Sequence, residues 1–248
     1  MSSPRVILII GAGQRIGQCI ASKFSQAGYE VALVARSLEP GLTPEGFLNI
    51  KFDLSETRLV PQIFQTTKEI LGVPNIMVYN GAKRLVTPPE DPFSASLDTI
   101  AASRAVGFDS AYIAAQEFLR GVQELPSSLP KAFIFTGNAL NQIAIPGVIP
   151  FAIGKVSAAM MIEYAANAYG KGGFKFYFTD ERLADGRPAG QGIDGPAHGD
   201  LYLSLAHEEK QSHWLVTFTK EEGRKNFPGV DFDGNTREDH FRMLYTTS

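Results

Sequence analysis

The chain has 248 residues, of which 44% are hydrophobic and 20% are charged, and its formal net charge is −3. This composition is typical of a soluble globular protein and argues against a disordered chain. The sequence has no long basic run, so nothing in it favours nucleic acid as a partner.

We expect one domain over residues 1–248, because single α/β domains often reach this length. No apolar run approaches the roughly 18 residues that are needed to cross a bilayer. The single Cys19 cannot form an internal disulfide, which fits a reducing compartment. We therefore expect a cytoplasmic protein without a membrane partner.

Short apolar runs rich in β-branched residues alternate with longer stretches that have helical character. Near-continuous apolar strands are typical of a parallel sheet that is buried on both faces. The pattern predicts an α/β fold of the Rossmann type, with a doubly wound parallel sheet of about seven strands between two helical layers. The expected strands lie at residues 5–10, 30–35, 47–52, 75–79, 131–136, 174–178 and 213–218.

The stretches between these strands are long enough for crossover helices. They lie at residues 14–27, 56–71, 97–125, 148–169 and 198–209, and Gly107 interrupts the third of them. Residues 179–197 contain several Gly and Pro residues among mixed charges and are the most loop-like part of the chain. Because long loops in compact domains tend to be functional, we expect this segment to cover the active site and to set substrate choice.

The first expected strand leads into a glycine-rich turn, Gly-Ala-Gly-Gln-Arg-Ile-Gly, that opens the first helix. Gly11, Gly13 and Gly17 let the backbone approach a pyrophosphate, and Arg15 and Ile16 lie between them. The free N–H groups of the helix N-terminus would then point at this anion. The turn predicts a dinucleotide site, although a tight turn that only caps a helix remains the alternative.

The end of the second expected strand indicates which dinucleotide is bound. NAD sites usually place an acidic residue there, whereas this chain has Arg36 followed by Ser37. A guanidinium at this point favours the 2′-phosphate of NADP(H), and Arg15 adds a second cation. The alternative for Arg36 is a solvated surface arginine.

Two further strand ends carry candidate cofactor residues. Asp53 and Leu54 follow the third strand, where the carboxylate can accept from the adenine amino group while Leu54 packs near the ring. Asn80, Gly81 and Ala82 end the fourth strand, at the edge where ligands of open α/β sheets lie. Asp53 could instead cap the next helix, and the second group could be a simple turn.

Taken together, these motifs resemble those of the short-chain dehydrogenase/reductase family. The glycine turn is similar to the family's Gly-x-x-x-Gly-Ile-Gly loop with Arg15 in place of the middle glycine, a variant found in some NADPH-using members. The Asp53-Leu54 pair resembles the family's adenine contact, and the segment 79–82 resembles its Asn-Asn-Ala-Gly. The resemblance covers roughly residues 5–178 and implies NADP(H) as the cofactor.

The resemblance also implies where the catalytic tetrad of Asn, Ser, Tyr and Lys should lie. The lysine position falls on Lys155, the tyrosine position on Phe151, the serine position on Asn138 and the asparagine position on Arg104. Three of the four are therefore replaced. After the sixth strand the family tends to have Pro-Gly, whereas this chain has Thr179, which we expect near the nicotinamide carboxamide.

The phenyl ring of Phe151 cannot donate a proton, so we expect almost no reduction of ordinary carbonyl substrates. We predict a noncanonical oxidoreductase whose small-molecule substrate needs no phenolic acid: an iminium, or an activated enone whose enolate is stabilised by Asn138 and Arg104. A substitute acid is a further option, with Lys155, Tyr112 or Tyr177 as candidates. We expect desolvation and the charge of Arg104 to lower the pKa of Lys155.

Two alternatives remain from the sequence. The protein could bind NADP(H) without redox turnover, as a sensor, a scaffold or a cyclisation catalyst, or the active site could lie elsewhere. The helix at residues 148–169 is apolar nearly all round, and the resemblance implies that it packs in a homodimer or homotetramer. Burial beneath residues 179–197 is the alternative. The spacing of the histidines predicts no metal site.

Overall fold

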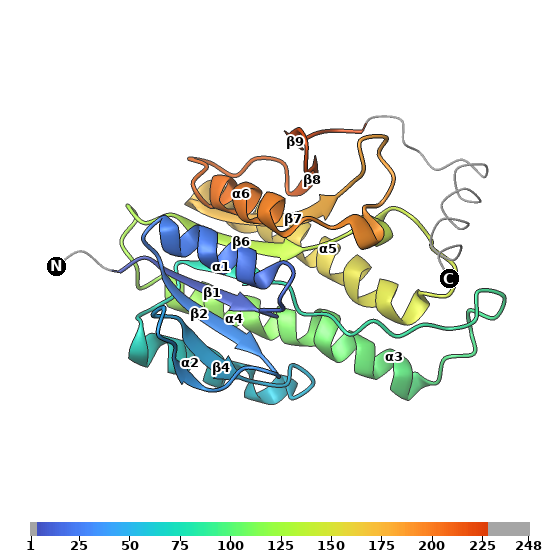
Figure 1. Ribbon diagram of the computed structural model, residues 1–248, viewed down its shortest axis with the longest axis horizontal. Coiled ribbons are helices and arrows are strands. Elements are labelled where there is room, and N and C mark those ends of the chain that lie inside the picture. Colours follow the sequence, from blue (N-terminus) through green and yellow to red (C-terminus); the bar gives the residue numbers. More distant parts are fainter. Residues whose placement is uncertain (1–3, 228–248) are drawn as a thin grey trace.

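The computed structural model describes residues 4–227. In that part of the chain the strands form a single sheet in the order β3-β4-β2-β1-β5-β6-β7-β8-β9 (Figure 1). In this spatial order, the seven neighbouring strands β4, β2, β1, β5, β6, β7 and β8 are parallel, as the sequence predicts. The expected count of about seven is exceeded by β3 and β9, two-residue strands that pair antiparallel at the edges. The expected domain over residues 1–248 extends beyond the described residues at both ends.

The strands lie close to their expected positions. Their bounds are Val6–Ile10 for β1, Glu30–Ala35 for β2, Gly41–Leu42 for β3, Leu48–Lys51 for β4, Ile76–Tyr79 for β5, Lys131–Thr136 for β6, Phe174–Glu181 for β7, Leu215–Thr219 for β8 and Gly223–Arg224 for β9.

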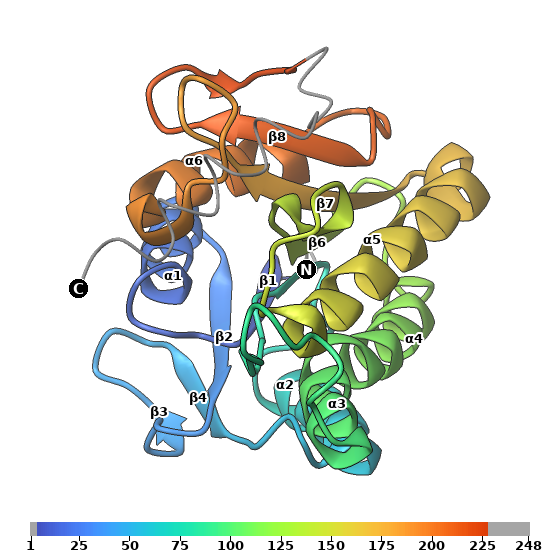
Figure 2. The same cartoon turned by 90° about the vertical axis from the view of Figure 1, so that its right-hand side faces the viewer.

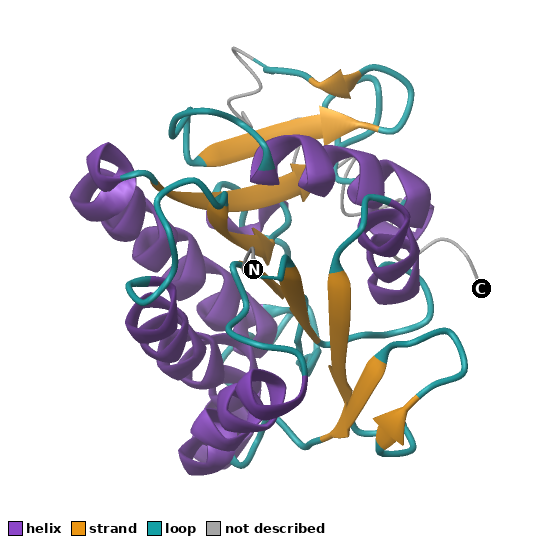
Figure 3. Cartoon of the chain, turned by 90° about the vertical axis from the view of Figure 1, so that its left-hand side faces the viewer, coloured by secondary structure: helices purple, strands orange, loops and turns teal. Residues whose placement is uncertain are grey.

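Helices cover both faces of the sheet and make three layers. Their bounds are Gly17–Gln26 for α1, Val60–Ile70 for α2, Leu97–Arg104 for α3, Ser110–Val122 for α4, Ile149–Tyr169 for α5 and Gly195–Ala206 for α6. Helices α1 and α6 lie on one face, and α2, α4 and α5 lie on the other (Figures 2 and 3).

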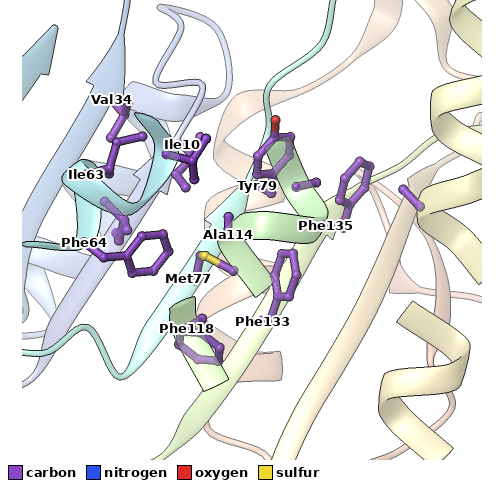
Figure 4. Packing of buried hydrophobic residues seen from close by; sticks show 14 of the residues in the cluster. Ile10, Val34, Ile63, Phe64, Met77, Tyr79, Ala114, Phe118, Phe133 and Phe135 are labelled. Carbon is purple, nitrogen blue, oxygen red and sulfur yellow. The ribbon is translucent and has the colours of Figure 1, made fainter. Parts of the chain in front are cut away.

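The strand residues divide between two apolar cores by simple alternation. In β1, Leu8 and Ile10 point toward α2 and α4, whereas Ile7 and Ile9 point toward α1. All four are fully buried, which explains why the strand reads as an uninterrupted apolar run. Figure 4 shows part of the first core, where aromatic and aliphatic side chains of β5 and β6 meet α2 and α4.

The helical stretch expected over residues 97–125, with an interruption at Gly107, is divided at that residue in the structure. A π-helical turn, Ala105–Asp109, separates α3 from α4. At its centre Gly107 lies directly against Gly154 of α5, because a Cβ on Gly107 would come within 3.3 Å of the Gly154 Cα atom. The two helices therefore cross at a pair of glycines, and the extra residue in the turn is a feature that often accompanies functional sites.

The segment expected to be a loop from residue 179 onward begins as a strand. Strand β7 continues to Glu181 because Phe178–Glu181 pair in register with Leu215–Phe218 of β8. Helix α6 then starts at Gly195, three residues before its expected start. The intervening segment, residues 182–194, is short and contains one isolated β-bridge, between Arg182 and Pro188.

Helix α5 corrects the expectation that no segment is long and apolar enough to span a bilayer. Residues 149–172 pass that test by length and composition. The helix nevertheless packs on the sheet, where Ala158, Ala159 and Ile162 belong to the core shared with β5, β6 and β7. Packing on the sheet accounts for the apolar residues on this face of the helix.

Candidate functional site

The carboxyl ends of β1 and β5 hold the glycine turn in place. Gly11 has φ +89°, and a Cβ at this position would lie 2.5 Å from the backbone nitrogen of Gly81. The side-chain amide of Asn80 donates to the Gly11 carbonyl oxygen at 2.8 Å. The two expected motifs are thus one structural unit, and the Asn80 side chain is committed to positioning the turn.

Gly13 has free space beside its Cα atom, whereas Gly11 is closely packed. No atom lies within 4 Å of the place that a Cβ on Gly13 would occupy. Helix α1 begins just beyond with Gly17, its N-terminal Ile16 makes no side-chain capping bond, and no acidic residue lies in its first turn. Open space beside an uncapped helix N-terminus fits a dinucleotide pyrophosphate.

The cations expected to select the 2′-phosphate are accessible. Arg15, Arg36 and Ser37 are exposed. Arg36 is close enough to Asp53 for its charge to help lower the pKa of that carboxyl, although hydrogen bonds from Ser55 contribute more. Arg36 therefore lies at the same edge of the sheet as the expected adenine pocket.

Asp53 makes a local turn at the end of β4. Its Oδ1 atom accepts from the Ser55 backbone nitrogen at 2.9 Å. The next helical turn, Thr57–Leu59, has Glu56 at its N-cap position, so the structure does not show Asp53 as the cap of that turn. Leu54 is buried, and a Cβ on Gly81 would come within 2.4 Å of its side chain. Ala82, the next residue, is exposed. Leu54 is thus buried against Gly81, whereas Asp53 and Ala82 are exposed beside it.

Lys155 is buried on the face of the sheet that α5 covers. Its Nζ atom donates to the Thr136 carbonyl oxygen at 2.7 Å and lies 4.9 Å from the ring centroid of Phe135 and 5.6 Å from that of Phe151. Burial lowers the pKa of Lys155 to about 8, against the opposing charge of Asp180. Lys155 and Phe151 therefore share one helix face, as their spacing predicts.

The other two expected catalytic positions differ in their surroundings. Asn138 follows Thr136 by two residues, and its Oδ1 accepts from the Leu140 backbone nitrogen at 3.1 Å. Arg104 instead pairs with Asp109, at 3.1 Å, with about half of its side chain exposed. The expected like-charge effect of Arg104 on the pKa of Lys155 is wrong, because Arg104 is neutralised by its own partner and the nearest opposing charge is Asp180.

Sequence reasoning missed a buried ion pair at the end of β7. Arg182 Nε donates to Asp180 Oδ2 at 2.6 Å, and both side chains are almost completely buried. Arg182 also donates to Gln142 Oε1 at 2.8 Å and to the Gly186 carbonyl oxygen at 2.9 Å. The signal in the sequence was a run of charged residues directly after an apolar strand, which we had assigned to a loop.

Glu181 and Thr179 point to the opposite face, toward α6. Glu181 accepts from the Asp194 backbone nitrogen at 2.9 Å, which ties down the end of the segment 182–194. The Thr179 hydroxyl is bonded to the Tyr202 hydroxyl at 2.6 Å, and Tyr202 in turn donates to Thr136 Oγ1 at 2.8 Å. The hydroxyl expected at the carboxamide is therefore occupied within the protein.

Glu181 gives a pH-dependence of stability. Burial raises its pKa from 4.5 to about 7, so between these values the native state holds a proton that the unfolded state has lost. Its stabilising effect is complete below about pH 4.5 and is lost as the pH rises through about 7. We compare the free energy of unfolding of Glu181→Gln with that of the wild type at two pH values. The difference should favour the variant by about 2–3 kcal/mol more at pH 8 than at pH 4.5.

Urea unfolding of both proteins at these two pH values measures this difference. A Gln oxygen can still accept from Asp194, so the hydrogen bond is retained in the variant. An equal effect of the substitution at both pH values would contradict the assignment.

The two tyrosines considered as substitute acids are placed elsewhere. The Tyr177 hydroxyl donates to Glu208 Oε2 at 2.7 Å, on the α6 face, and burial raises its pKa. About half of Tyr112 is exposed, and its ring packs against Phe108. Within residues 4–227, no group of three or more His, Cys, Asp or Glu residues is arranged to hold a metal ion.

Comparisons with known proteins agree with the fold. The profile of the short chain dehydrogenase family matches residues 5–175. The curated protein Short chain dehydrogenase/reductase dmxR12 of Cryptosporiopsis sp. (strain 8999) is 36% identical, and the match covers 92% of this chain and 96% of that protein.

Solved structures of the same fold include two bacterial short-chain dehydrogenases. One, from Serratia marcescens, has a TM-score of 0.69 at 17% identity, covering 87% of this chain and 96% of the other. The second, from Mycobacterium marinum, has a TM-score of 0.71 at 17% identity, covering 88% and 95%. At these identities the structures support the fold alone.

Proposed function

The chain belongs to the short-chain dehydrogenase family, and on that premise we propose that it binds NADPH and delivers hydride to a small organic substrate without a phenolic acid. The observation that carries the proposal is the pairing of an open, uncapped glycine turn with a buried Lys155 beside the ring of Phe151. The first feature suits a dinucleotide, and the second suits a site that has lost its usual proton donor.

We propose that the cofactor follows the carboxyl edge of the sheet. Its pyrophosphate lies against Gly13 and the start of α1, and its adenine lies beside Leu54. Arg15, Arg36 and Ser37 hold the 2′-phosphate, because all three side chains are exposed and Arg36 and Ser37 directly follow β2. Bound NADPH supplies the hydride.

Lys155 holds the nicotinamide end in this proposal. Its Nζ atom has one acceptor among the described residues, the Thr136 carbonyl, and an ammonium group carries three donors. The remaining donors can reach a ribose hydroxyl. At the position after β7, the hydroxyl of Thr179 is occupied by Tyr202, so the nicotinamide carboxamide would contact the backbone there.

Reversing one charge tests the choice of coenzyme. We expect Arg36→Asp to weaken NADPH binding by at least about tenfold and to leave NADH binding unchanged or improved, because a carboxylate repels the 2′-phosphate and accepts from a ribose hydroxyl. Isothermal titration calorimetry with both coenzymes measures the two affinities. Arg58→Asp, an exposed arginine away from β2, is the matched control. Equal losses in the two variants would contradict the role of Arg36.

A homodimer or homotetramer is also part of the proposal. Val156, Met160 and Tyr164 recur at one-turn intervals along α5 and are 46%, 52% and 71% exposed. Such a stripe on a helix that is otherwise packed on the sheet is typical of a subunit interface. We propose that this face of α5 meets a second copy of the chain, and cytoplasmic localisation stays a prediction.

We expect Met160→Asp to shift the protein to monomers, because a buried carboxylate in an apolar interface is costly. Size-exclusion chromatography with light scattering measures the mass. Gln62→Asp, on the exposed face of α2, introduces the same charge elsewhere and should leave the mass unchanged. A monomeric wild type would remove this part of the proposal.

The reaction itself is tested by NADPH oxidation over matched panels of saturated carbonyls, imines and conjugated enones. We expect turnover with at least one class that does not need strong oxygen protonation, and little with saturated ketones. Binding of NADPH without turnover on any panel would favour the alternative of a non-redox binder.

A further inference from the structure

Three ionic side chains are buried together where the sequence predicted one. Lys155 is 4% exposed, Asp180 is fully buried and Arg182 is 3% exposed. Asp180 Oδ2 accepts from Arg182, whereas its Oδ1 atom is buried and has no hydrogen-bond partner among the described residues. An unsatisfied buried carboxylate oxygen is costly, so its retention needs a reason.

The sheet register places Asp180 on the same face as Lys155. Side chains alternate along β7, so Asp180 shares the face of Phe178, while Thr179 and Glu181 face α6. The ring of Phe178 stacks on that of Phe135 with centroids 5.6 Å apart, and Phe135 lies beneath the Lys155 Nζ atom. The carboxylate therefore lies on the same face of the sheet as the ammonium group, although no hydrogen bond or ion pair joins them.

We propose that Lys155 and Asp180 act as an ammonium–carboxylate pair across this buried face, without a direct hydrogen bond or ion pair between them, and that Lys155 protonates the oxygen of an enolate formed by hydride transfer to a conjugated enone. This inference rests on the proposed function and deepens it, since it names the substitute acid and the substrate class. Lys155 is the catalytic residue, and Asp180 is a positioning residue that acts through it.

The step balances without any further reactant. Hydride from NADPH adds to the β-carbon of the enone, the π electrons move to oxygen, and NADPH becomes NADP⁺. An N–H bond of the Lys155 ammonium breaks as an O–H bond forms. The enol then becomes the saturated ketone, and the Lys155 amine regains a proton from solvent.

The charges of the site favour an enone over an iminium. The charged groups that face the pair are Lys155 from α5, Asp180 from β7 and Arg182 from the segment after β7, which together carry a net positive charge. An enone develops negative charge on oxygen in the transition state, whereas an iminium arrives as a cation. The positive charge that develops on the nicotinamide is common to both. Arg104 does not contribute, because it is paired with Asp109.

The titration behaviour is consistent with this pairing. Burial lowers the pKa of Lys155 and raises that of Asp180 to about 6, and each charge opposes the effect of burial on the other. At neutral pH the carboxylate therefore keeps the buried ammonium protonated. An acid whose pKa lies near the working pH is the kind suited to proton transfer.

The pair is tested first in the free protein. NMR of ¹³Cε-labelled lysine should show one resonance that disappears in Lys155→Met and that titrates near pH 8 in the wild type. Because Asp180→Asn alone would leave the buried charge of Arg182 without the carboxylate that offsets it, the variant is Asp180→Asn/Arg182→Gln, with Arg182→Gln as its control. We expect the Lys155 pKa to fall by about one unit or more in the double variant relative to the control.

The second arm uses the holoenzyme. We expect Lys155→Met to lower kcat/KM for enones by 10²-fold or more at NADPH concentrations that saturate the variant. In the wild type, kcat/KM for enones should fall at high pH as Lys155 loses its proton. In the double variant this fall should shift to lower pH together with the Lys155 pKa. The proposed pair would be contradicted if the Lys155 pKa had the ordinary value of a lysine, or if it did not change in the double variant. Either result would count against the pair even if calorimetry shows NADPH binding. Absence of NADPH binding with the titration intact would instead remove the proposed function.

Discussion

Gly11→Ala is expected to destabilise the protein by about 3 kcal/mol or more, and to abolish NADPH binding with it. Two costs combine at this residue. A side chain is strained at φ +89°, and the new Cβ would lie 2.5 Å from the Gly81 backbone nitrogen and 2.6 Å from the Asn80 carbonyl carbon. Because both neighbours are backbone at the end of β5, neither can move without disturbing the sheet. Urea unfolding monitored by circular dichroism measures the effect.

Gly13→Ala is the matched control for this prediction. Its Cβ meets nothing within 4 Å and its φ is not positive, so stability should change by less than about 0.5 kcal/mol. The same methyl group would project into the space proposed for the pyrophosphate, and NADPH affinity should fall by about tenfold or more. If Gly13→Ala binds NADPH as the wild type does, the pyrophosphate does not lie where we propose.

Phe151→Tyr combined with Asn138→Ser is expected to raise the reduction of saturated ketones by about 10²- to 10⁴-fold, the usual contribution of a positioned general acid. The Phe151 ring centroid is 5.6 Å from the Lys155 Nζ atom, so a hydroxyl on that ring lies within the field of the ammonium group. A nearby cation lowers the pKa of a phenol. Steady-state NADPH oxidation with a ketone panel measures the gain.

The control places the same hydroxyl on a ring outside the site. Phe108, on the π-helical turn, packs against Tyr112 and is partly exposed, so Phe108→Tyr should leave ketone reduction at the wild-type level. No gain in the double variant, with NADPH binding intact, would mean that Phe151 is not at the proton-donor position.

The fold could be predicted from the sequence because its strands are uninterrupted apolar runs. The run from Ile7 to Ile10 is an example, and such runs are typical of a sheet that is covered on both faces. The edge strands β3 and β9 could not be found in this way, because two-residue strands carry no periodicity. The interruption of the helical stretch at Gly107 was expected, but its π-helical form was not, because the close approach of Gly107 and Gly154 is a contact between distant segments.

The glycine turn was predictable for a related reason. Gly11, Asn80 and Gly81 are local signals at strand ends, and parallel strands bring their carboxyl ends to one edge. Asp180 and Arg182 carried the opposite signal, because charged residues after an apolar run are usually solvated. Only the register of β7 against β8 shows that the strand continues and buries them. The partner of Arg104, five residues further on, was likewise set by the π-helical turn.

The central claim is that the carboxyl edge of this sheet binds NADPH although the expected proton donor is a phenylalanine. Calorimetric titration of the wild-type protein with NADPH and with NADH tests it most directly. The account predicts saturable binding of one cofactor per chain, tighter for NADPH than for NADH. No heat with either coenzyme, confirmed by unchanged NADPH fluorescence, would contradict it.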